Sequence, residues 1–121
     1  MLDRSALLAY LAGSVHVGEP LHEVIADGVR FAATAVTAAE TLAAVDNPKD
    51  RSALRRLLAL DSCAVLATPG SSWLELAYWR RYTGRVDLAT TVLASLDHEA
   101  PILTREARYA AEDLPIIHIP D

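Results

Sequence analysis

Cysteine and lysine are almost absent from this sequence. Cys63 is the only cysteine, so no internal disulfide is possible and a reducing compartment is expected. Because Cys63 lies in an apolar segment, we expect it to be an inert core thiol. The four histidines are scattered without zinc-ligand spacing, and we expect them to be ordinary surface or packing residues.

Several common signals are also missing. No apolar run is long and pure enough for a membrane span, and the amino terminus lacks the pattern of a secretory leader. We therefore expect a soluble, cytoplasmic protein with no membrane partner. No serine lies in a Gly-x-Ser-x-Gly motif and there is no phosphate-binding loop, so two common enzyme classes have no support.

The chain is nevertheless rich in material for a core. It has 121 residues, 52% of them hydrophobic, which suits one domain spanning residues 1–121. Its net charge of -5 argues against nonspecific nucleic-acid binding over the whole surface, but allows a local basic rim. Five arginines could contact RNA phosphates, although solvated helix faces are the default explanation and the better one for at least some of them: Arg80, Arg81, Arg85, Arg105 and Arg108.

Short apolar segments alternate with helical ones along the chain. Predicted strands lie at residues 1–2, 29–33, 63–67, 100–103 and 115–119. Predicted helices lie at residues 5–12, 20–26, 37–45, 51–60, 71–82, 87–96 and 104–111. This alternation indicates an α/β fold with a mainly parallel sheet and helices on both faces.

Four carboxylates lie at or just beyond strand-to-helix junctions: Asp3, Glu40, Asp87 and Glu106. In a parallel sheet such junctions share the edge formed by the carboxyl ends of the strands, where ligands bind. Four acids converging there would repel one another without a cation, and oxygen ligands suit Mg²⁺ or Mn²⁺. Such an ion can activate water and stabilise a phosphoryl transition state.

Each acid also has a purely structural explanation. Thr37 and Glu40 have the spacing of a capping box, and Asp87 is a good helix N-cap. Glu106 suits the first turn of a helix through the helix dipole. Asp3 has the weakest structural explanation because apolar residues flank it on both sides, and a buried charge needs a partner.

The sequence around these acids resembles a known family. The opening Leu2-Asp3-Arg4-Ser5-Ala6-Leu7-Leu8-Ala9-Tyr10-Leu11 is similar to that of PIN domains, especially the VapC-type toxins of bacterial toxin-antitoxin pairs. The segments 35–42, 86–89 and 100–109 resemble their second, third and fourth acidic motifs, and 114–120 resembles their closing segment. The similarity covers essentially the whole chain.

The resemblance implies a three-layer α/β/α sandwich and Mg²⁺- or Mn²⁺-dependent cleavage of single-stranded RNA. Asp3, Glu40 and Asp87 would hold the metal, and Glu106 would assist or orient water. Homodimers and inhibition by a cognate antitoxin protein are also implied.

Two other interpretations stay open. Arg4 stands where the family usually has a small hydroxyl residue, and Leu88 is a second candidate for the third motif position. Both features favour a catalytically inactive PIN-like binding module.

A haloacid-dehalogenase-like phosphatase or a receiver domain would need a second acid near Asp3 or a well-placed lysine. Ser5 holds that second position, and the only lysine, Lys49, lies in a predicted turn.

Overall fold

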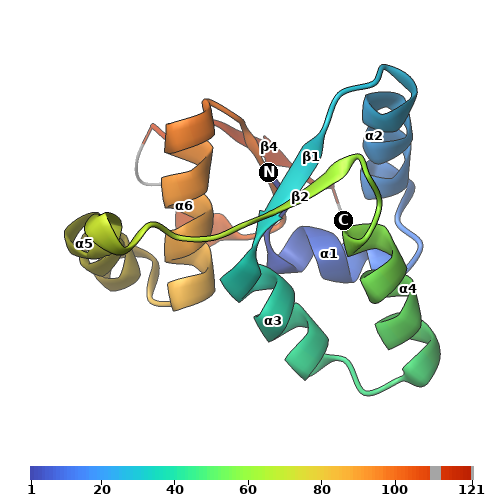
Figure 1. Ribbon diagram of the computed structural model, residues 1–121, viewed down its shortest axis with the longest axis horizontal. Coiled ribbons are helices and arrows are strands. Elements are labelled where there is room, and N and C mark those ends of the chain that lie inside the picture. Colours follow the sequence, from blue (N-terminus) through green and yellow to red (C-terminus); the bar gives the residue numbers. More distant parts are fainter. Residues whose placement is uncertain (110–112, 121) are drawn as a thin grey trace.

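A computed structural model describes residues 1–109 and 113–120 of the chain (Figure 1). Its helices are α1 (Arg4–Leu11), α2 (Val15–Ala26), α3 (Ala35–Ala44), α4 (Pro48–Leu58), α5 (Trp73–Thr83) and α6 (Val86–His98). Its strands are β1 (Phe31–Thr34), β2 (Cys63–Leu66), β3 (Ile102–Thr104) and β4 (Ile116–His118). Two short 3₁₀ turns are η1 (Gly70–Ser72) and η2 (Ala107–Tyr109).

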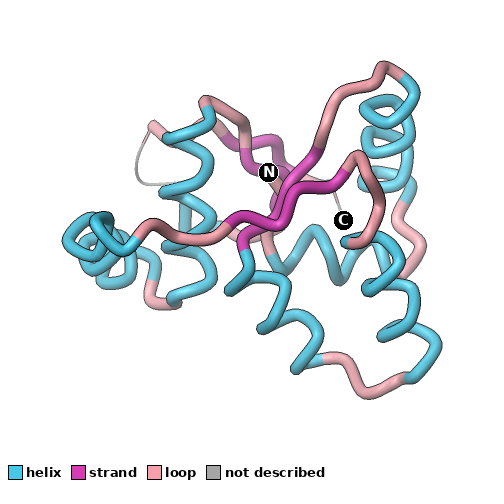
Figure 2. Tube along the Cα trace, in the orientation of Figure 1, coloured by secondary structure: helices cyan, strands magenta, loops and turns pink. Residues whose placement is uncertain are grey.

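The strands pair in parallel, as the alternating pattern predicts. β1 pairs with β2 and β3 pairs with β4. The first residues of the chain join the two pairs, because the Leu2 amide donates to the Ala32 carbonyl and the Leu103 amide donates to the Met1 carbonyl, both at 2.8 Å. The predicted first strand is thus reduced to a single parallel bridge between Leu2 and Leu103. Figure 2 shows the strands at the centre of the molecule with helices around them.

Two apolar clusters lie against these strands. Leu103 belongs to the larger one, which includes buried residues of α1, α2, α4, β1 and β2. Its neighbour Ile102 belongs to the smaller one, with Leu88 and Val92 of α6 and with Tyr109. Because successive strand residues point to opposite faces, β3 contributes to both clusters.

The prediction that α2 begins at Pro20 is wrong. The helix begins at Val15 and contains Pro20 in its interior, although proline cannot donate the hydrogen bond expected there. Val17 and Leu21 are buried one turn apart on the same side of this helix. Their burial holds the turn before Pro20 in helical conformation.

The capping box expected from Thr37 and Glu40 is also wrong. Helix α3 begins at Ala35, two residues before Thr37, and Thr34 is its N-cap. The Thr34 hydroxyl accepts a hydrogen bond from the Thr37 amide at 3.1 Å. Glu40 therefore lies beyond the first turn and plays no part in the cap.

Two further helix assignments differ from the structure. Arg85, not Asp87, is the N-cap residue of α6, and Asp87 lies in the first turn of that helix. The helix expected over residues 104–111 is a 3₁₀ turn at Ala107–Tyr109, preceded by Thr104 in β3, and its expected end at Ala111 lies outside the described residues.

The remaining elements agree in type with the sequence analysis, although their bounds shift; the helix expected at residues 51–60, for example, is Pro48–Leu58. Helix α5 ends at Thr83, and its C-cap is Gly84, whose positive φ of 81° is easily adopted only by glycine. Cys63 is buried at the start of β2, and burial raises the pKa of its thiol, as an inert core cysteine requires. Across the described residues, no helix combines the length and apolar character needed to span a membrane.

Candidate active site

Asp3 lies at the carboxyl edge of the strands and is almost completely buried, with 1% of its surface exposed. Its Oδ1 accepts hydrogen bonds from the Ser5 hydroxyl at 2.6 Å and from the Ala6 amide at 2.9 Å, which caps α1. Its Oδ2 accepts from the Thr104 hydroxyl and from the Tyr109 hydroxyl, the latter at 3.2 Å. Four donors therefore compensate for the burial of this carboxylate.

Asp87 is held by a single strong partner. Its side chain is 4% exposed, and the guanidinium of Arg85 approaches both carboxylate oxygens. The Arg85 Nε donates to Oδ1 at 3.0 Å, and Nη2 donates to Oδ2. This bidentate pair, with burial of Arg85 opposing it, raises the pKa of the guanidinium, so the cation is retained.

Glu106 joins the same arrangement from the segment after β3. Its Oε2 accepts from the Arg85 Nη1 at 3.5 Å, and its Oε1 lies 3.7 Å from the Arg108 Nε. Its backbone amide donates to the Thr104 hydroxyl at 2.7 Å, and that hydroxyl in turn donates to Asp3. Arg85 is therefore shared between Asp87 and Glu106, while Thr104 connects Glu106 to Asp3.

Tyr109 is the buried hydrogen-bond donor next to these acids, and it contacts Asp3. It is fully buried, and burial raises the pKa of its hydroxyl well above the ordinary value of 10.0. Asp3, with which it is hydrogen-bonded, raises this pKa further, and the charges of Asp87 and Glu106 act in the same direction. We call Asp3, Asp87, Glu106, Arg85 and Tyr109 the acidic cluster.

A network of threonine hydroxyls lies beside the acidic cluster, and sequence reasoning missed it. The Asp87 carbonyl accepts from the hydroxyls of Thr90 and Thr91, each at 2.9 Å, and from Thr37 of α3 at 3.3 Å. Thr34 at the end of β1 lies within hydrogen-bond distance of Thr90, at 2.8 Å. The signal available in the sequence was the presence of threonines among the apolar residues of α6.

These positions bear on Leu88 and Arg4, the two departures noted in the sequence analysis. Leu88 is 1% exposed and packs in the smaller apolar cluster, so Asp87 is the residue of this pair that reaches the acidic cluster. Arg4 is the first residue of α1, whereas Arg85 is the arginine that contacts both Asp87 and Glu106. The sequence analysis gives Arg85 two roles, phosphate contact or a place on a solvated helix face, and neither is the pairing with Asp87.

The fourth predicted acid, Glu40, is not part of this arrangement. It is exposed on α3, and no hydrogen bond or ion pair joins it to another residue in the described part of the chain. The structure therefore brings together three of the four acids that the sequence places at strand-to-helix junctions.

The donor chemistry of the acidic cluster suits Mg²⁺ or Mn²⁺, because carboxylate and hydroxyl oxygens are hard ligands. The arrangement of these oxygens, however, does not suit such an ion. Both oxygens of Asp87 are engaged by Arg85, and both oxygens of Asp3 accept hydrogen bonds. Within residues 1–109 and 113–120, no three His, Cys, Asp or Glu side chains are grouped so as to hold a metal ion.

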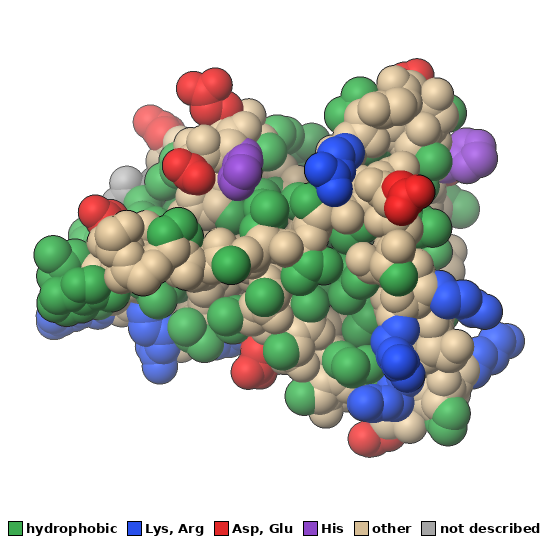
Figure 3. Space-filling model, in the orientation of Figure 1, with side chains coloured by type: hydrophobic (Ala, Val, Ile, Leu, Met, Phe, Trp, Pro, Cys, Tyr) green, Lys and Arg blue, Asp and Glu red, His purple; other side chains and the backbone are tan. Residues whose placement is uncertain are grey.

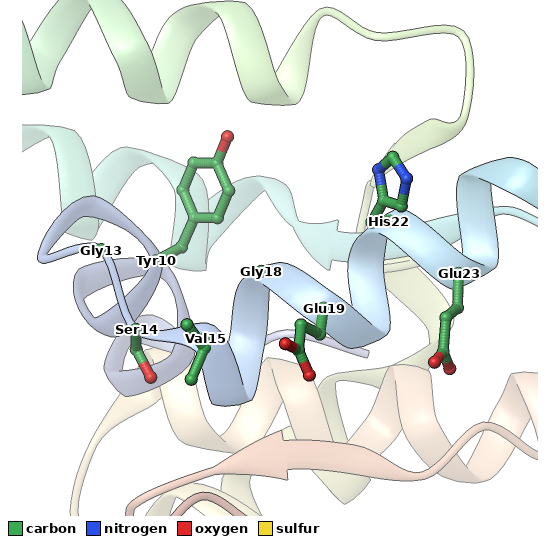
Figure 4. Close-up of a pocket in the computed structure, with 8 residues that line it drawn as sticks. All are labelled: Tyr10, Gly13, Ser14, Val15, Gly18, Glu19, His22 and Glu23. Carbon is green, nitrogen blue, oxygen red and sulfur yellow. The ribbon is translucent and has the colours of Figure 1, made fainter.

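A separate surface hollow of about 510 Å³ lies between the end of α1 and α2. Its polar side chains do not converge: Figure 4 shows Tyr10 and His22 on one side of α2, and Glu19 and Glu23 on the other. This hollow offers no common point to a ligand, so the acidic cluster remains the better candidate site.

The chain matches no protein-family profile, and a search of curated proteins finds none that matches it. The interpretation of the site therefore depends on its own geometry and chemistry.

Proposed function

We propose that this protein is a PIN-like endoribonuclease that cleaves single-stranded RNA with Mg²⁺ or Mn²⁺ as its cofactor, and that it is the toxin of a toxin-antitoxin pair. The observation that carries the proposal is the gathering of Asp3, Asp87 and Glu106, from three distant segments, around Arg85 and Tyr109. Grouping buried carboxylates is costly, and such clusters are found preferentially at functional sites.

The arrangement of the strands supports the same proposal. Met1 and Leu2 link two parallel pairs, and apolar clusters involve the neighbouring residues Ile102 and Leu103. We propose that these pairs form one sheet between two helical layers, as in the PIN sandwich. Asp3 follows the first bridge directly and Thr104 ends β3, so the cluster lies where parallel sheets bind ligands.

Within this function the described residues have definite tasks. The donors around Asp3 fix its carboxylate in one orientation. Glu106, with its side chain 22% exposed, is the acid of the cluster best placed to contact a water molecule. A divalent ion, when bound, would supply charge for the phosphoryl transition state.

The direct test is to incubate the protein with a labelled single-stranded RNA, with and without Mg²⁺ or Mn²⁺. We expect metal-dependent cleavage that is lost in Asp3→Asn and in Glu106→Gln, and retained in Asp61→Asn, a change at an exposed acid outside the cluster. Because Asp3 is buried, circular dichroism should confirm that each variant is folded. Absence of metal-dependent cleavage by the folded wild-type protein would refute the proposal.

The alternative is an inactive PIN-like module that binds RNA without cleaving it. The bidentate Arg85–Asp87 pair favours it, because an internal cation already neutralises the buried acid. Fluorescence anisotropy with a labelled RNA in EDTA, followed by a cleavage assay in Mn²⁺, separates the two. Binding without cleavage supports the module.

The proposed homodimer and antitoxin contacts would use the apolar face of α5. Trp73, Leu74 and Tyr78 are 65%, 63% and 57% exposed there, and Figure 3 shows apolar side chains gathered at this end of the molecule. Large exposed apolar side chains in one patch are typical of interaction surfaces. Sedimentation velocity should show a dimer for the wild-type protein and a monomer for Leu74→Asp.

A further inference from the structure

Helix α4 carries a positively charged face on a chain that is acidic as a whole. The helix contains four cationic residues and one acid, whereas the whole chain has a net charge of -5. Exposed residues at helical spacings of three and four share one side of the helix and its C-cap: Lys49, Ser52, Arg55, Arg56 and Ala59. We call this the α4 basic face; the buried Leu54 and Leu57 lie on the opposite side. Figure 3 shows lysine and arginine side chains gathered at this end of the molecule.

A hollow of about 380 Å³ lies on the α4 basic face. It is lined by Ser52, Arg55, Arg56 and Ala59, so two guanidinium groups and a hydroxyl surround it and no carboxylate does. In the part of the chain that the structure describes, no ion pair engages the side chain of Lys49, Arg55 or Arg56. The face therefore presents hydrogen-bond donors and positive charge without an internal counterion.

The stability of the helix does not account for this charge. Arg55 and Arg56 lie in the last turn of α4, where the helix dipole favours cations. Lys49 lies in the first turn, where the same dipole opposes a cation. A face that keeps cations at both of its ends is better explained by attraction of an anion from solution.

Arg51 joins α4 to the helix that begins beside the acidic cluster. Its Nη1 donates to the Leu42 carbonyl at 2.7 Å and to the Val45 carbonyl at 2.9 Å, which fixes α4 to the end of α3. Helix α3 starts after Thr34 of the threonine network and, with 10 residues, is about 15 Å long. The α4 basic face thus lies roughly one helix length from the acidic cluster, and an extended chain is long enough to contact both.

We propose that the α4 basic face binds the phosphodiester backbone of single-stranded RNA, and that the hollow beside Arg55 and Arg56 takes one of its phosphate groups. This inference rests on the proposed function, in which such RNA is the substrate. Guanidinium groups bind phosphate oxygens through paired N–H donors, and the Ser52 hydroxyl adds another donor. The hollow has no large apolar side chain, which a protein partner would bury at the core of an interface, so the observations favour RNA over an acidic protein.

Fluorescence anisotropy with a labelled single-stranded RNA, in EDTA so that the RNA stays intact, tests the inference. We expect Arg55→Gln and Arg56→Gln each to weaken binding about fivefold at low salt. Each should also reduce the slope of log affinity against log salt concentration by about 0.7, the value for one phosphate contact on a single strand. Arg55→Lys keeps the charge and should keep the slope of the wild type.

Arg30→Gln is the matched control, because it removes an exposed arginine that lies outside the α4 basic face. Its RNA affinity should stay within about twofold of the wild type. Equal affinities of the wild-type protein, Arg55→Gln and Arg56→Gln would overturn the inference. Tighter binding of poly-glutamate than of RNA at equal charge would also overturn it, since the face would then belong to an acidic protein.

These outcomes are distinct from those of the cleavage test. RNA that is bound through Arg55 and Arg56 but stays intact in Mg²⁺ or Mn²⁺ would refute only the proposed function. Metal-dependent cleavage with a KM unaffected by either substitution would refute only the present inference.

Discussion

The hydroxyl of Tyr109 donates to Oδ2 of Asp3 at 3.2 Å, across 106 positions of sequence. Both side chains are buried, with 0% and 1% of their surfaces exposed. The contact ties the segment after β3 to the start of the chain. It also stabilises a carboxylate that would otherwise be a costly buried charge.

Replacing Tyr109 by phenylalanine should therefore destabilise the fold without leaving a cavity. Asp3 would keep three donors, so we expect a loss of about 1–2 kcal/mol in the free energy of unfolding, in the range for a hydrogen bond to a charged group. Urea denaturation of the wild-type protein and of Tyr109→Phe at neutral pH measures this loss. Tyr78→Phe, at an exposed position of α5, is the matched control and should change stability little. Equal effects of the two substitutions would contradict this account.

The same tyrosine predicts a loss of stability in alkali. Burial holds its pKa well above 10.0, the ordinary value, so the native state keeps a proton that the unfolded chain releases. Its contribution to stability is complete below about pH 9 and declines as the pH rises past about 10, by up to about 1.4 kcal/mol per pH unit. Tyr109→Phe has no hydroxyl at this position and therefore lacks this pH-dependent contribution to stability.

The stability difference between the wild-type protein and Tyr109→Phe should consequently narrow between about pH 9 and pH 11. Urea denaturation of both proteins across this range measures the difference, and subtraction removes the titration of the other tyrosines and of Cys63. A constant or widening difference would show that folding does not raise the pKa of Tyr109.

The threonine network gives a prediction about helix packing. The Thr37 hydroxyl of α3 lies 3.1 Å from that of Thr91 and 3.3 Å from the Asp87 carbonyl, both on α6. Thr37→Val keeps the side-chain volume but leaves these buried groups with one hydrogen-bond partner fewer. It should lower the free energy of unfolding by about 1–2 kcal/mol. Thr68→Val, at a partly exposed loop position, should be nearly neutral. Urea denaturation of both variants measures these costs, and unchanged stability of Thr37→Val would mean that the hydroxyl contributes nothing to the helix contact.

The sequence was informative where local chemistry decides the structure. Parallel strands and the end of α5 at Gly84 follow from apolar runs and from the conformational freedom of glycine. Asp3 was recognised as buried because its neighbours are apolar, and this is confirmed.

The errors arose where distant parts of the chain compete with local preferences. The sequence predicts a helix start at Pro20, but burial of Val17 maintains a helical turn before it. Asp87 has the chemistry of an N-cap, yet its carboxylate pairs with Arg85. Tyr109 gave no periodic signal, since its partner Asp3 is at the opposite end of the sequence. A single sequence contains no direct record of such pairings.

Glu40 offers the clearest separation of stability from activity. It is exposed on α3 and has no partner among the described residues, so Glu40→Gln should change the free energy of unfolding by less than about 0.5 kcal/mol. If the proposed metal draws this carboxylate towards the acidic cluster, RNA cleavage should nevertheless fall by roughly 100-fold. Glu19→Gln, at an exposed position of α2, should affect neither quantity. Thermal unfolding and a cleavage assay on the same samples give both results. Unaltered cleavage by Glu40→Gln would remove Glu40 from the site and leave Asp3, Asp87 and Glu106 as its only acids in the part of the chain that the structure describes.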